Sequence, residues 1–235
     1  MRKIEVCSTS VSDVEAAYKG GAIRVELCSA LTADGVTPSY GVIKQSIEVG
    51  IPVNVLIRPR EGDFVYTQEE IDVMIEDIKI CKHLGVNGFV IGALDENGDI
   101  DRTAIRQLID EIKSNNSNFE ITFHRAFDEC KNTEKALEDI IELGCDRLLT
   151  SGCQKSAWEG RETIQKLVKQ ANGRIIIMAG AGVKPENIVE LERITTATEF
   201  HSSAREKIKS NSDSIFGCRP QPTSVKIVEK LATLT

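Results

Sequence analysis

The chain has 235 residues, of which 41% are hydrophobic and 28% charged, and its formal net charge is −7 at pH 7. This composition is sufficient for a sizeable core, and an acidic chain without clustered Lys and Arg argues against nucleic-acid binding. No apolar run approaches the length of a membrane span or signal segment, so we expect a cytoplasmic protein with no membrane partner. Its seven cysteines lack CxxC spacing and are expected to be mostly reduced thiols.

Short β-branched or apolar runs recur along the chain, each followed by turn residues and a segment with helical periodicity. We predict strands over residues 3–8, 23–28, 52–57, 88–93, 120–125, 146–151, 174–179 and 198–203. Amphipathic helices are predicted over residues 11–19, 39–49, 67–84, 103–114, 133–143 and 162–171. This alternation predicts an α/β fold, a parallel (β/α)8 TIM barrel forming a single domain over 1–235. A doubly wound sheet is the alternative, although it usually has fewer strands.

Helix ends are also marked in the sequence. Thr67 and Glu70 predict a capping box, and Pro185 suits a first helical turn. Glycines stand where helices should stop, at Gly20–Gly21, Gly50, Gly85 and Gly144. After the last strand, residues 205–222 are predicted to form a long polar loop before a final helix at about 223–233.

Strand parity predicts which side chains face the inside of the barrel, because alternate residues point to opposite faces. The apolar parity should face the helices: Ile4, Val6, Ile23, Val25, Leu27, Val53, Val55, Ile57, Ile121, Phe123 and Phe200. The opposite parity should turn inward: Lys3, Glu5, Cys7, Arg24, Glu26, Cys28, Asn54, Arg58, Glu120, Thr122, His124, Glu199, His201 and Ser203. Because buried charges must be paired, these inward groups should form a connected network.

The stretch ITFHRAFDE places His124 at the C-terminal end of its strand, the end where barrel active sites lie. His124 has an intrinsic pKa suited to proton transfer near neutrality, and Asp128 would orient it if the following loop folds back. Glu26 and His201 are candidate partners in acid/base chemistry, since they project toward the same mouth. The alternative is a histidine that only satisfies a carboxylate inside the barrel.

Arg58 opens the polar loop RPREGDF, in which Arg60 follows closely. Two guanidinium groups at a barrel mouth favour a carboxylate or phosphate ligand, which arginine binds in a bidentate manner. The alternative for Arg58 is a structural ion pair with Glu26 or Asp63. Phe64 is expected to pack under this loop, and the alternative is that it lines a pocket.

The turns after the last two predicted strands, MAGAGVKPEN and HSSAR, offer a second anion-binding feature. Backbone N–H groups around Gly180, Gly182, Ser202 and Ser203 would lie where many barrels bind phosphate. An ordinary tight turn explains the glycines nearly as well, and the third glycine of a dinucleotide fingerprint is missing.

Cys7 and Cys28 end the first two strands in similar contexts, IEVCS and VELCS. If Glu5 pairs with Glu26 across these parallel strands, the two thiols face each other and would suit a soft ion such as Cu(I). Cys153 could add a third sulfur at the same rim. The alternative is that these cysteines are small buried hydrophobic residues.

In these motifs and their order along the chain, the sequence resembles the CutC family of copper homeostasis proteins. The resemblance covers residues 3–205 and is carried by RVELC (24–28), TPS with GV (37–42), IPV and IRPREGDFVY (51–66), TFHRAFD (122–128), LTSG (149–152), IIMAGAGVKPEN (176–187) and HSSA (201–204). The resemblance implies a cytoplasmic (β/α)8 barrel that handles copper, with Cys7 and Cys28 matching the cysteine pair proposed to hold Cu(I).

Two functional hypotheses therefore stand side by side. The first is a copper homeostasis protein that binds a copper ion through Cys7 and Cys28. The second is a TIM-barrel enzyme that acts by acid/base chemistry on a small anionic or phosphorylated metabolite. The sequence decides neither between them nor whether the chain forms a homo-oligomer.

Overall fold

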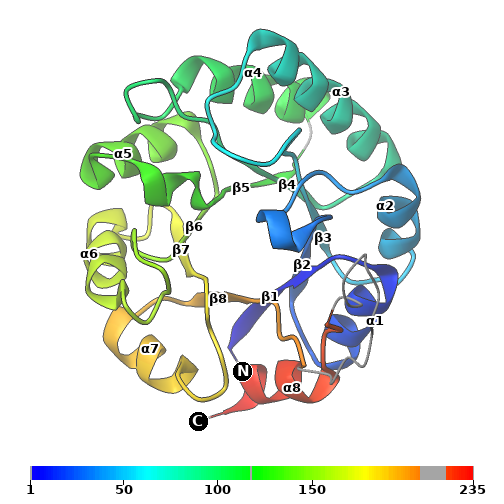
Figure 1. The fold of residues 1–235 in the computed structure, drawn as a ribbon, viewed down its shortest axis with the longest axis vertical. Helices are drawn as coiled ribbons and strands as arrows, with labels where there is room; N and C mark the ends of the chain where they lie inside the picture. Colours follow the sequence, from blue (N-terminus) through cyan, green and yellow to red (C-terminus); the bar gives the residue numbers. More distant parts are fainter. Residues whose placement is uncertain (1, 117, 207–220, 235) are drawn as a thin grey trace, which may run out of the picture.

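The structure is a computed structural model and describes residues 2–116, 118–206 and 221–234. Its parallel strands close into a single barrel in chain order, with β8 paired to β1, and the helices form a ring outside it (Figure 1). The predicted TIM barrel and its eight strands are confirmed. The strands are β1 (Lys3–Ser8), β2 (Arg24–Leu27), β3 (Val53–Leu56), β4 (Gly88–Ile91), β5 (Glu120–Phe123), β6 (Arg147–Thr150), β7 (Ile176–Ala179) and β8 (Glu199–Ser202).

The helices begin and end close to the predicted positions. Thr67 accepts from the Glu70 backbone N–H and the Glu70 side chain accepts from that of Thr67, which is the predicted capping box. Gly85 and Gly144 end their helices with φ of 82° and 85°, the left-handed conformation that glycine adopts without strain. The helices are α1 (Val11–Lys19), α2 (Tyr40–Ile47), α3 (Gln68–Leu84), α4 (Arg102–Lys113), α5 (Thr133–Leu143), α6 (Arg161–Ala171), α7 (Ile188–Thr195) and α8 (Val225–Thr233).

One prediction of a helix end is wrong: Pro185 is not in a first helical turn, because α7 begins only at Ile188. The predicted stop at Gly20–Gly21 is confirmed. Gly20 is right-handed, with φ −80°, and Gly21 takes the left-handed conformation, with φ 83°.

The C-terminal part of the chain returns to the barrel as α8, the predicted last helix, which packs against α1 and β1 (Figure 1). Arg205 and Thr223 form an antiparallel bridge. Most of the predicted loop over 205–222, namely residues 207–220, lies outside the described residues. Within the described part of the chain, no helix is long and apolar enough to cross a membrane.

The predicted division of the strand faces is confirmed, with one exception. Ile23 is 37% exposed, because it lies just before β2 and not within it. The remaining residues of the apolar parity are buried in one core between the barrel and the helices: Ile4, Val6, Val25, Leu27, Val53, Val55, Ile57, Ile121, Phe123 and Phe200.

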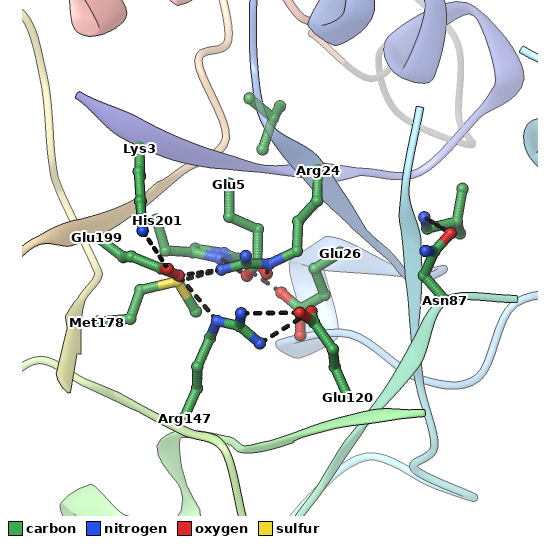
Figure 2. Close-up of polar contacts among 12 residues, drawn as sticks. Lys3, Glu5, Arg24, Glu26, Asn87, Glu120, Arg147, Met178, Glu199 and His201 are labelled. Atoms are coloured by element: carbon green, nitrogen blue, oxygen red, sulfur yellow. Dashed lines mark hydrogen bonds and ion pairs between the residues drawn. The ribbon is translucent and has the colours of Figure 1, made fainter. Parts of the chain in front are cut away.

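Inside the barrel, a connected set of ion pairs lies near the N-terminal ends of the strands (Figure 2). Arg24 on β2 donates to Glu5 on β1 and to Glu199 on β8. Arg147 on β6 donates to the same Glu199 and, with two N–H groups, to Glu120 on β5. The predicted network inside the barrel is thus confirmed.

Arg147 was not among the residues predicted to face inward. The signal was available, because Leu148 faces the helix-side core and its neighbour must then point to the opposite face. With Arg147 included, Glu199 has a guanidinium on each side. The carboxylate of Glu199 is therefore shared between strands that lie apart in the sheet, which ties the barrel together across its interior.

We predict that Arg24→Met lowers the free energy of unfolding by about 3–5 kcal/mol, because Glu5 and Glu199 would lose the guanidinium that they share. Urea denaturation followed by circular dichroism measures this change. Arg193→Met is the control, since Arg193 pairs with Glu190 on the exposed face of α7, and we expect a change within about 0.5 kcal/mol. Similar losses for both variants would contradict a special role for the buried network.

Candidate functional site

A cavity of about 1030 Å³ lies at the C-terminal ends of the strands, where the loops that lead into the helices converge. Active sites of TIM barrels lie at this end. The structure places at this mouth the side chains that strand parity predicted to point there. The inward residues that line the cavity are Cys7, Glu26, Cys28, Arg58, His124 and His201.

The thiols of Cys7 and Cys28 meet at this mouth, with their sulfur atoms 3.6 Å apart. The residue pairing from which their approach was predicted is wrong, since Glu5 pairs with Arg24 and Cys7 with Glu26. Strands in a closed barrel are sheared relative to one another, and this offset places Cys28 just beyond the last paired residues. The two side chains converge diagonally inside the barrel and are both buried.

The Cys7 thiol is held in its protonated form in the absence of a metal. Its hydrogen bond with Cys28 and its burial raise the pKa of Cys7 well above the usual value. The sulfur pair lies against Leu56 and Val90, two apolar side chains of the barrel interior. Ionisation of the Cys7 thiol therefore needs a compensating positive charge.

His201 on β8 lies between the carboxylates of Glu5 and Glu26 (Figure 2). Its Nδ1 lies 2.8 Å from Glu5 and its Nε2 lies 3.3 Å from Glu26. Burial alone would lower the pKa of His201, but these carboxylates outweigh it and raise the pKa. Burial raises the pKa of Glu26 to about 7, whereas His201 and Arg24 overcome burial at Glu5 and lower its pKa to about 2.

The groups around Cys7 form a potential set of metal ligands. Ligand atoms of Cys7, Glu26 and His201 all lie within 4.8 Å of one another, and all three residues are buried. Cys28 adds a second sulfur next to Cys7. Cys153 does not extend this set, contrary to expectation, because it packs against the helix-side core and is not among the described residues that line the cavity.

His124 follows β5 and points into the barrel mouth, as predicted, but it does not titrate near neutrality. Burial, followed by the charge of Arg58, lowers the pKa of His124 to about 3. Its Nδ1 accepts from the backbone N–H of Ala126, 3.1 Å away, where the chain turns into the short helix Arg125–Glu129. The imidazole is therefore neutral and carries its proton on Nε2.

Asp128 does not orient His124, so that prediction is wrong. Its carboxylate instead accepts from the hydroxyls of Thr150 and Ser151, from backbone N–H groups of the loop after β6, and from Arg125. The short helix after β5 carries this carboxylate toward β6. Asp128 therefore joins two loops at the rim of the barrel.

Arg58 is buried and forms neither of the ion pairs considered from the sequence, with Glu26 or with Asp63. Its guanidinium donates to backbone oxygens of the neighbouring loops and lies 4.9 Å from the ring centre of Phe64. Phe64 packs against the core, as expected, and also lines the cavity, which was the alternative. The loop that begins at Arg58 thus contributes both a cation and an aromatic ring to the mouth.

Arg60, by contrast, is not available to a ligand in the cavity. It bonds Glu70 and Asp63 on the outside of the same loop, and it is not among the described residues that line the cavity. The prediction that both guanidinium groups serve one anion is therefore wrong. The charges of Glu70 and Asp63 already neutralise Arg60.

The glycine turn after β7 contributes only part of what was predicted. Gly182, Ser202 and Ser203 line the cavity, whereas Gly180 does not. A Cβ at Gly180 would lie 2.5 Å from a methyl group of Leu149, so this glycine is explained by packing. The Ser202 hydroxyl donates to the Val183 carbonyl and joins the turns after β7 and β8.

Comparisons with known proteins agree with this fold. The CutC family matches residues 2–206. A family protein CutC from Parabacteroides distasonis is 49% identical over 211 residues, which cover 89% of this chain and 85% of the relative. Another from Histophilus somni is 47% identical over 219 residues, covering 91% and 88%.

Solved structures with a similar fold include a protein of the same family. A protein from Streptococcus agalactiae described as a copper homeostasis protein CutC is 36% identical, with a TM-score of 0.81 over 86% of this chain and 99% of the other. A phosphoribosylanthranilate isomerase from Thermotoga maritima is only 10% identical, with a TM-score of 0.60 over 98% and 96%. The second similarity shows the barrel fold alone.

We predict that His124 makes the protein less stable as the pH falls. Between the usual pKa near 6.5 and the folded value of about 3, the unfolded chain binds one more proton, so the free energy of unfolding falls by up to about 1.4 kcal/mol per pH unit. His124→Asn should remove this contribution, because the amide oxygen still accepts from Ala126 but does not titrate. Urea denaturation between pH 4 and 6.5 measures both slopes, and equal slopes would contradict the prediction.

Proposed function

The chain belongs to the CutC family, and we propose that it binds copper(I) through the thiolates of Cys7 and Cys28, in the cytoplasm, where such thiols stay reduced. The observation that carries this proposal is the approach of the two sulfur atoms to 3.6 Å at the mouth of the barrel. Thiolate ligands favour soft ions such as Cu(I) over hard ions.

The surroundings of the sulfur atoms support a soft, poorly hydrated ion. Cys7 and Cys28 are 4% and 1% exposed and contact Leu56 and Val90. An ion bound between the sulfur atoms would be shielded from water on this apolar side. It would enter from the cavity, which both cysteines line.

The charges beside the thiols also suit such a centre. Two thiolates and one Cu(I) ion together carry one negative charge, which is costly to bury unless a positive charge lies nearby. The carboxylates of Glu5 and Glu26 raise the pKa of His201, and in its protonated form His201 would supply that charge. In its neutral form it would instead offer a ring nitrogen, within 4.8 Å of the Cys7 sulfur, as an additional ligand.

We predict that the parent protein takes up one Cu(I) ion per chain and that Cys28→Ser, or Cys7→Ser with Cys28→Ser, abolishes this uptake at stoichiometric concentration. One remaining sulfur cannot replace the pair that shares the ion. Anaerobic titration against a chromogenic Cu(I) chelator measures uptake, and circular dichroism checks that each variant is folded.

Cys153→Ser is the control for this experiment. It removes a half-buried thiol that packs outside the cavity, and we expect it to bind copper as the parent does. Parental copper binding by the double variant would contradict the proposal. Loss of binding in Cys153→Ser would assign the ion to a different set of sulfur atoms.

An enzyme that acts by acid/base chemistry on a small anionic or phosphorylated metabolite is the second candidate. It is supported by the large cavity at the catalytic end of the barrel and by the buried Arg58 and His124 that line it. His124 is neutral, so it would serve such a reaction as a hydrogen-bond donor and not as a base. This candidate requires an anion site.

A further inference from the structure

We propose that Arg58 and His124 form a binding site for a small oxyanion, meaning a carboxylate or phosphate group, at the barrel mouth beneath the ring of Phe64. The site is built on the ends of β3 and β5, whereas the thiols belong to β1 and β2. It requires neither copper nor a reaction. It is the anion site that the second candidate function, an enzyme acting on an anionic metabolite, requires.

The guanidinium of Arg58 lacks a carboxylate that would neutralise it. It donates to the backbone oxygens of Ala33, Gly35 and Gly62 at 3.0, 2.7 and 2.7 Å. Among the described residues, no Asp or Glu oxygen lies within 4.0 Å of it. Its charge and a side-chain hydrogen bond also act on Tyr66, but burial outweighs both and raises the pKa of Tyr66, so this phenol stays neutral and offers no compensating charge.

The other two buried arginines inside the barrel have their charges neutralised by glutamates. Arg24 and Arg147 are 4% and 6% exposed, and each is bonded to two glutamates. Arg58 is buried to the same degree, at 3% exposure. A buried charge without a counter-ion costs several kcal/mol, and a bound anion would remove that cost.

Arg58 and His124 each keep a hydrogen-bond donor that is unused within the described structure. The Nε of Arg58 and the Nε2 of His124 are buried without a partner. Because His124 Nδ1 accepts from Ala126, the proton of the neutral ring lies on Nε2. Carboxylate and phosphate oxygens accept hydrogen bonds without donating any when ionised, so a single group satisfies both donors and the charge.

Two neighbouring residues shape the site. A Cβ at Gly92 would lie 2.4 Å from His124 Cε1, so the absence of a side chain at Gly92 leaves room for the imidazole. The Phe64 ring covers the pair, with its centre 5.0 Å from the imidazole centre and 4.9 Å from Arg58 Cζ. An anion bound to both donors would displace this ring toward the cavity.

The test is a titration of the ¹⁵N-labelled protein with inorganic phosphate and, separately, with acetate, at an ionic strength kept constant with sodium chloride. The Nε–H signal of Arg58 should shift and saturate, and the thermal midpoint should rise with it, because the ligand binds the folded state. A response to phosphate alone identifies a phosphorylated ligand, and a response to acetate alone identifies a carboxylate.

Variants of His124 and Phe64 make the test specific. Arg58 itself holds three loop carbonyls, so His124→Asn is the primary variant: it keeps the acceptor for Ala126, loses the Nε2 donor and should bind about tenfold more weakly. Phe64→Ala removes the cover and should bind more tightly than the parent. Arg193→Gln removes a charge from the outer surface, where Arg193 pairs with Glu190, and should bind as the parent does.

The proposal is overturned if neither anion gives a saturable shift in the parent, or if His124→Asn binds both anions as the parent does. Copper uptake by Cys7 and Cys28 is measured on the same protein, so either site can fail alone. Saturable anion binding without turnover of any phosphorylated or carboxylated compound would keep this site and remove the enzyme candidate.

Discussion

The pairing of buried charges inside the barrel is the constraint on which the rest of the structure depends. Near the N-terminal ends of the strands, the guanidinium groups of Arg24 and Arg147 are paired with glutamates. Glu5 connects this network to the mouth, because it bonds Arg24 on one side and His201 on the other. Through His201 the network reaches Glu26 and the neighbouring thiols. The charge beside the thiols is therefore set by residues that also hold the barrel together.

The sequence was sufficient to predict the barrel and the residues that face its interior. Alternation along a strand follows from the backbone itself and needs no knowledge of the partner strand. Because the apolar parity was nearly unbroken, Glu26, Arg58, His124 and His201 could all be placed at one mouth before any coordinate was known. The same argument would have found Arg147, had the parity of Leu148 been applied to its strand.

What the sequence could not predict depends on strand offset and on loop geometry. The pairing of Glu5 with Arg24, and not with Glu26, follows from the shear of a closed barrel, which leaves no local mark in the sequence. The role of Asp128 depends on how the short helix after β5 turns toward β6. The neutral state of His124 likewise reflects burial and a positive neighbour, neither of which its strand position reveals.

At the mouth of the barrel, apolar side chains separate the sulfur pair of Cys7 and Cys28 from the proposed anion site of Arg58 and His124. Leu56 and Val90 contact the sulfur pair, and each lies two positions before a residue of the proposed anion site, Arg58 or Gly92. These two strands therefore present apolar side chains to the thiols. At the next inward position, one strand carries the N–H donors of Arg58 and the other, at Gly92, leaves room for the imidazole of His124. The hydrogen bond with Cys28 and burial raise the pKa of Cys7, so this thiol ionises only when a cation compensates it. The guanidinium of Arg58 lies beyond these apolar side chains. It needs an anion, because its positive charge is not paired with a carboxylate among the described residues.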